Sequence, residues 1–217
     1  MLRWIGDCLD SSIGKKAVMA VTGLALVGYL FVHLWGNLQL YVGDTAFDDY
    51  VGKLKDWGIL LYVAEIGLAL IFVGHIYLGV RVGMENREAR KQGYVVRSTR
   101  GKATVSSMTM LVTGLVVLAF LIKHILDFRF GAGFADAPAA STRELLTTPI
   151  HALVYLVGVV ALSFHLAHAF KSACQTLGVN HPNVTPLLEK ISLALAILLG
   201  PGFASFPIYY AFAGGAQ

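Results

Sequence analysis

Apolar residues are gathered into five long segments that are separated by short polar stretches. These segments cover residues 17–40, 59–80, 103–126, 150–170 and 191–212. Each is close to the roughly 20 residues that an α-helix needs to cross about 30 Å of hydrocarbon. The pattern therefore predicts five transmembrane helices. The last segment contains Pro201 and Pro207, which we expect to kink it.

The composition agrees with a membrane protein. Of the 217 residues, 56% are apolar and only 14% are charged, against about 25% charged in a typical soluble chain. This excludes a disordered chain and argues against a soluble globular domain. The polar connections are too short for a soluble catalytic unit, so residues 1–217 are expected to form one transmembrane domain. Cys8 and Cys174 are too few for a disulfide scaffold, and neither lies in a C-x-x-C-H run, which excludes covalent c-type haem.

The basic residues predict the orientation in the membrane. When the five segments alternate in direction, 12 of the 17 Lys and Arg residues fall on one side, including the dense run within residues 81–102. Short cytoplasmic loops carry such an excess. The N-terminus is therefore expected in the cytoplasm and the C-terminus outside. Because the concentration of basic residues on one side of the membrane explains the net charge of +4, this charge does not indicate a nucleic-acid partner.

Histidines are the residues that indicate chemistry. His181 lies in a polar loop, and the other six lie in or at the edge of the predicted spans: His33, His75, His124, His151, His165 and His168. Ionisable residues inside a membrane are costly and are functional candidates by default. A single buried histidine can also simply bond a neighbouring helix, so the arrangement of the set carries the argument.

Four of these histidines fall into two layers when depth is counted from the cytoplasmic end. His75 and His165 lie roughly 9 Å deep, His33 roughly 24 Å and His124 roughly 31 Å. Two bis-histidine haems need this arrangement, because each iron takes two axial ligands from facing helices. A zinc site would need three or four ligands at one depth, and scattered structural histidines would not pair.

Within the fourth segment, His165 and His168 compete for the role of ligand. They are three residues apart and share one helix face. We favour His165, because Gly158 lies two turns earlier and removes bulk where a porphyrin would pass. His168 is nearer the charged end and could hold a haem propionate. His151 could be interfacial or lie near a quinone.

Several motifs resemble those of a known family. They are S-S-I-G-K-K (11–16), M-A-V-T-G (19–23), V-H-L-W-G-N-L (32–38), G-H-I-Y-L-G (74–79) and S-F-H (163–165), and the likeness extends over essentially the whole chain. They resemble the cytochrome b558 subunits of succinate dehydrogenases and fumarate reductases, which are single-chain membrane anchors of succinate:quinone oxidoreductases.

The resemblance implies an all-α integral membrane fold, in which four of five transmembrane helices form a dihaem core and the fifth is added to it. It implies a proximal haem b between His75 and His165 and a distal haem b between His33 and His124. A flavoprotein and an iron–sulfur subunit would dock on the cytoplasmic face of a bacterial inner membrane, in part on the basic loop of residues 81–102. Electrons would pass from the iron–sulfur subunit through both haems to a quinone, commonly menaquinone in such anchors.

The chain would then be a non-catalytic subunit of the enzyme complex. It has no dinucleotide fingerprint, no set of Fe–S cysteines and no flavin domain, so it is not expected to oxidise succinate itself. Two other classes stay open as alternatives. One is the dihaem cytochrome b subunit of a formate dehydrogenase or hydrogenase, and the other is a small transporter with intramembrane histidines.

Glu65 is the one carboxylate inside the five predicted spans. It lies ten residues outward of His75, roughly 15 Å, and hence near the depth of the outer pair. We expect it to handle protons close to the quinone, because quinone reduction consumes protons as well as electrons. Asp44, Asp48 and Asp49 are competitors in the exposed loop that precedes the second span. Glu65 could instead bond a neighbouring helix or reach toward the outer surface.

Overall fold

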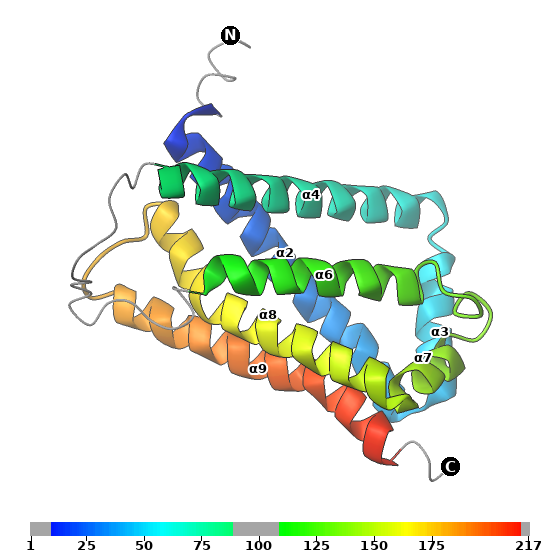
Figure 1. The fold of residues 1–217 in the computed structure, drawn as a ribbon. Helices are drawn as coiled ribbons and strands as arrows, with labels where there is room; N and C mark the ends of the chain where they lie inside the picture. The colour runs from blue at the N-terminus through cyan, green and yellow to red at the C-terminus, as the bar shows by residue number, and fades with distance from the viewer. Residues whose placement is uncertain (1–9, 89–108, 214–217) are drawn as a thin grey trace.

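The structure is a computed structural model that describes residues 10–88 and 109–213. It is all-helical over these residues, with five helices long and apolar enough to cross a membrane. The five are α2 (Ser12–Val42), α4 (Ile59–Glu88), α6 (Met110–Phe128), α8 (Pro149–Thr176) and α9 (Thr185–Ala213). They lie side by side and alternate in direction (Figure 1). The prediction of an all-α fold with five spanning helices is confirmed.

The helices extend beyond the apolar segments that predicted them. At the start of α2, Ser11 caps the helix, because its side chain accepts a hydrogen bond from the Gly14 amide at 2.9 Å. At the end of α4 the helix continues for two more turns through charged residues. Hydropathy alone misses such turns, since they are polar. For the third span, residues 103–108 lie outside the described residues, and α6 begins at Met110.

The fifth spanning helix contributes to the hydrophobic core. α9 packs along α8 and contacts α2 and α7, and the buried apolar cluster draws on all of these helices. Small residues permit this approach: a Cβ added at Gly200 would come within 2.0 Å of Ser163 Oγ. The helix is continuous through both prolines, and the kink expected there stays a prediction.

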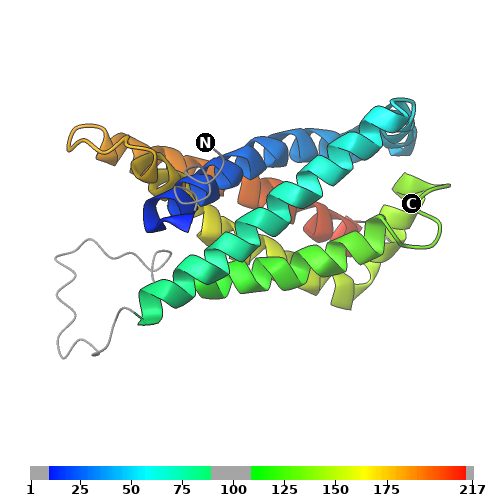
Figure 2. The same ribbon diagram turned by 90° about the horizontal axis from the view of Figure 1, so that it is seen from above.

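Two short helices lie at the end of the bundle where α2 and α6 finish. They are α3 (Asp44–Lys55) and α7 (Pro138–Thr147), and both fall in stretches expected to be simple connections (Figures 1 and 2). Asp44 pairs with Arg143 at 2.6 Å, and Asp48 accepts a hydrogen bond from the Ala139 amide at 2.8 Å. These two aspartates therefore join α3 to α7.

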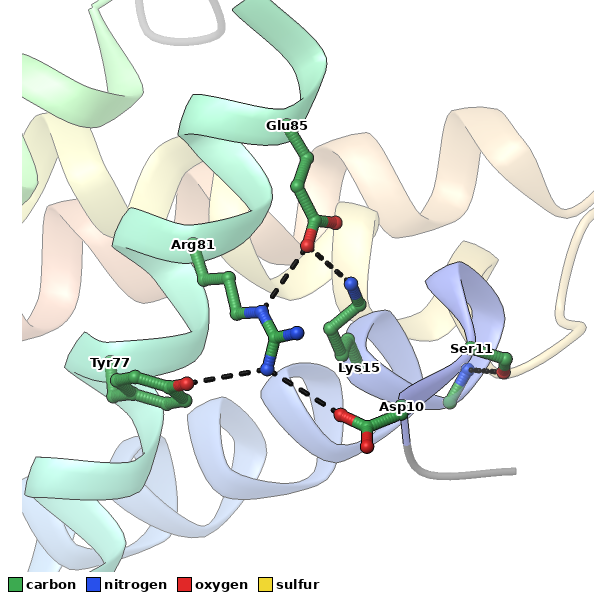
Figure 3. A network of polar contacts seen from close by, with 7 residues as sticks. Asp10, Ser11, Lys15, Tyr77, Arg81 and Glu85 are labelled. Carbon is green, nitrogen blue, oxygen red and sulfur yellow. Dashed lines mark hydrogen bonds and ion pairs between the residues drawn. The ribbon is translucent and has the colours of Figure 1, made fainter. Parts of the chain in front are cut away.

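At the other end of the bundle, a polar network joins the start of α2 to the end of α4 (Figure 3). Lys15, which is only 6% exposed, pairs with Glu85 of α4. Arg81 contacts the same carboxylate at 3.2 Å, the Tyr77 hydroxyl at 3.2 Å and Asp10 at 3.5 Å. The network gives the S-S-I-G-K-K stretch a structural role, because it fixes the start of α2 against α4.

Replacing Lys15 with methionine is expected to lower the melting temperature of the purified protein. The variant keeps the length of the side chain but leaves Glu85 with Arg81 as its remaining partner, so the loss is partial. Lys16→Met is the matched control, since Lys16 has no ion pair with another described residue. Equal melting temperatures for the two variants would contradict this role for Lys15.

Candidate functional site: two layers of histidines

The outer histidines face each other across the bundle. His33 on α2 and His124 on α6 have ring centroids 5.6 Å apart and ring planes at 86°. Nδ1 of His124 is buried and has no hydrogen-bond partner among the described residues. The two imidazoles come from different helices, and one ring nitrogen of His124 has no hydrogen-bond partner among the described residues. Such a pair could ligate a group bound between the rings.

Aromatic side chains enclose this outer pair. Tyr29 stacks on His33 at 5.5 Å, and Phe203 of α9 lies 5.6 Å from the same ring. Around His124, Phe120 lies at 5.8 Å and Phe128 at 5.0 Å. Such rings supply an apolar, water-excluding wall. Tyr29, Phe120 and Phe128 are each four residues from their histidine, so helical spacing could have indicated them; Phe203 comes from another helix and leaves no such signal.

The inner histidines are held against neighbouring helices. Nδ1 of His75 lies 3.1 Å from the Met19 carbonyl and 3.2 Å from the Thr22 hydroxyl. The carbonyl must accept, so His75 carries its proton on Nδ1 and keeps Nε2 free. Histidines that ligate metals usually donate their second ring N–H in this way. His165 packs near Gly114, and its buried Nδ1 has no hydrogen-bond partner within the described part of the chain.

The neighbours of the inner histidines place them in a separate layer. A Cβ added at Gly23 would lie 3.0 Å from the His75 ring, and one at Gly114 would lie 3.4 Å from His165. Gly23 precedes His33 by ten residues on α2, and Gly114 precedes His124 by ten on α6, roughly 15 Å along each helix. The ring contacts among the described residues include His33 with His124 but not His75 with His165.

The side chain of Phe120 occupies the space next to Gly158. A Cβ added there would lie 2.2 Å from Cγ of Phe120, so the glycine admits this ring of α6. The argument that Gly158 makes room for a porphyrin beside His165 is therefore wrong, and the choice between His165 and His168 loses that support. His168 is partly buried one turn closer to the end of α8. Gly23 and Gly114 are the glycines that actually border the inner histidines.

Two further histidines, His151 and His181, were assigned to neither layer. His151 is in the first turn of α8, and its buried Nδ1 has no partner within residues 10–88 and 109–213. His181 is exposed in the loop before α9. Over the same residues, no three His, Cys, Asp or Glu side chains gather in a way that could hold a metal ion.

Glu65 is paired, and it is not the only carboxylate inside a spanning helix. Arg129, at the end of α6, approaches Glu65 Oε2 with an N–O distance of 3.2 Å. Asp127 also lies within α6, and its side chain is only 12% exposed. The prediction that Glu65 stands alone is wrong because α6 runs past the apolar segment that defined the predicted span.

The chemistry of these histidines fits haem ligation. The outer pair offers facing imidazoles, and the inner layer offers a free Nε2 on His75 and an unpartnered nitrogen on His165. The outer ring distance of 5.6 Å is slightly shorter than two imidazoles need around one iron, about 6 Å from Fe–N bonds near 2 Å.

Fold and site together define a multi-pass helical membrane protein in which His33 and His124 face each other from two spanning helices. The chain is similar to the succinate dehydrogenase cytochrome b558 subunit of Bacillus subtilis (strain 168). The two are 24% identical over 187 residues, which cover 85% of this chain and 88% of the relative. No family model matches the chain, and no solved structure matches it.

Proposed function

We propose that this chain is the membrane-anchor cytochrome b subunit of a succinate:quinone oxidoreductase. The contact between His33 and His124, 5.6 Å apart on two different spanning helices, carries the proposal. Facing histidines on two spanning helices are the feature expected of a haem-binding membrane anchor. The similarity to a cytochrome b558 subunit over most of both chains supports the same conclusion.

In this proposal His33 and His124 hold one haem b, and His75 and His165 hold the other. When bound, the two haems would supply one-electron redox chemistry between an iron–sulfur subunit on the cytoplasmic side and a quinone, such as menaquinone, in the membrane. The chain's own residues orient the imidazoles, through Met19 and Thr22 for His75 and through aromatic packing for His124. His168 is proposed to contact a propionate of the inner haem.

The proposed partners are a flavoprotein and an iron–sulfur subunit at the end of the bundle that carries Lys15 and Arg81. The excess of basic residues there supports a cytoplasmic location for this end and for the N-terminus, in a bacterial inner membrane. Part of the proposed docking loop, residues 89–102, lies outside the described residues.

The test is made on the complex purified with its neighbouring subunits. We expect absorbance of two b haems per chain and their reduction on addition of succinate. Haem absorbance without reduction by succinate, but with reduction by formate or hydrogen, would favour the related dihaem anchors instead. A preparation that contains no haem would contradict both.

Glu65→Gln is expected to slow quinone reduction and to change its pH dependence, with both haems retained. The substitution removes the carboxylate that could pass protons and leaves Arg129 without its partner. Arg129→Gln separates these effects, because it removes the ion pair and keeps the carboxylate. If Glu65→Gln has the same rate and pH profile as the wild type, Glu65 has no role in proton transfer.

A further inference from the structure

A buried polar pair joins α6 to α8 beside the outer histidines. Asp127 uses its two carboxylate oxygens separately: Oδ1 pairs with Lys123 one turn earlier, and Oδ2 accepts a hydrogen bond from the Tyr155 hydroxyl at 2.8 Å. The Asp127 side chain is 12% exposed and Tyr155 is 6% exposed. A carboxylate and a phenol within spanning helices are costly unless they satisfy each other, as these do.

The Tyr155 ring packs against the residues around His124. Its centroid lies 5.9 Å from the His124 ring at 61°, 5.2 Å from Phe120 at 89° and 5.9 Å from Phe128 at 89°. A phenylalanine would fill the same volume at this position without any polar group to satisfy. Packing alone therefore does not explain the hydroxyl. Its hydrogen bond to Asp127 does, because this bond fixes the position of the Tyr155 ring.

His124 depends on packing for its orientation. Nδ1 of His124 has no hydrogen-bond partner within residues 10–88 and 109–213, whereas Nδ1 of His75 is fixed by a carbonyl and a hydroxyl. Groups around a ligating histidine usually set its ring orientation, and so tune the bound metal. Around His124 the neighbours are aromatic rings, and among Phe120, Phe128 and Tyr155 only Tyr155 is itself anchored by a hydrogen bond.

We propose that Tyr155, anchored by Asp127, is a positioning residue that sets the ring plane of His124. The inference rests on the proposed function, in which His124 is an axial haem ligand. Asp127 acts through Tyr155 and does not touch the ligand. The orientation of an axial imidazole affects the electronic state of the iron, so the effect is measurable by spectroscopy without an activity assay.

The experiment compares variants of the assembled complex by electron paramagnetic resonance and by redox titration of haem absorbance. Tyr155→Phe keeps the ring and loses its anchor, so it should retain both haems and shift the g-values and midpoint potential of one haem. That haem is the one lost in His33→Ala. Tyr209→Phe is the matched control, because this tyrosine of α9 packs on Tyr41 and Tyr210 away from His124; it should leave both haem signals unchanged.

Two further variants separate anchoring from charge. Asp127→Asn retains an oxygen that can accept from Tyr155, so it should keep the wild-type g-values. Lys123→Met/Asp127→Leu removes acceptor and counter-ion together, so it should reproduce the Tyr155→Phe shift, and it also tests the idea if Tyr155→Phe does not fold. If Asp127→Asn gives the full shift, charge and not anchoring is the cause. Unchanged signals in Tyr155→Phe with both haems bound would overturn the inference alone, whereas a wild-type complex without haem would overturn the proposed function.

Discussion

Replacing His75 or His165 with alanine is expected to remove the same haem signal, and replacing His33 or His124 is expected to remove the other. Each iron needs two axial ligands in line, and the two layers are roughly 15 Å apart along the helices. A histidine in one layer cannot replace a ligand in the other. Each of the four variants should therefore lose about half of the haem absorbance, the largest effect that we expect from any single substitution.

A redox titration of haem absorbance in the four variants makes the comparison, with His181→Ala as the control because this histidine is exposed in a loop. His168→Ala should keep two haems, with one potential shifted if it contacts a propionate. Retention of the inner haem in His165→Ala together with its loss in His168→Ala would identify His168 as the ligand. If His75→Ala and His165→Ala lose different haems, the layered arrangement itself is wrong.

The spanning helices were predictable because a single physical requirement dominates them. A segment that crosses hydrocarbon must be apolar for about 20 residues, and this leaves a strong pattern in the sequence. Short α3 and α7 leave a much weaker one, since their stability comes from contacts such as Asp48 with the Ala139 amide, which join residues far apart in the chain. The polar ends of α2 and α4 were missed because they too depend on contacts between residues far apart in the chain, such as Lys15 with Glu85.

In the candidate site, too, some features were predictable from the sequence and others were not. Counting residues along helices of known rise places His33 and His124 at similar depths, and their rings meet in the structure. Counting gives no information on which side chain of another helix faces a given residue. Gly158 shows the consequence: its position two turns before His165 suggested that it made room for a porphyrin, and the structure places the Phe120 ring there instead.

Gly158→Ala is expected to destabilise the protein, although alanine is normally the better helix former. The added Cβ would lie 2.2 Å from Cγ of Phe120, at the base of the ring, so the whole side chain must move. Overpacking of this kind costs about 1–3 kcal/mol. Because Phe120 also packs on His124 at 5.8 Å, its displacement should disturb the outer haem and leave the inner one unchanged.

Thermal unfolding of the purified protein and the haem spectra of the same samples measure both effects. Gly67→Ala on α4 is the matched control, since a Cβ there meets nothing within 4 Å, and its stability should equal or exceed that of the wild type. In Gly158→Ala/Phe120→Ala the clash is absent, so the double variant should be more stable than the two separate losses predict. Purely additive losses would mean that Phe120 does not occupy the space above Gly158, and that α6 and α8 pack differently around the outer histidines.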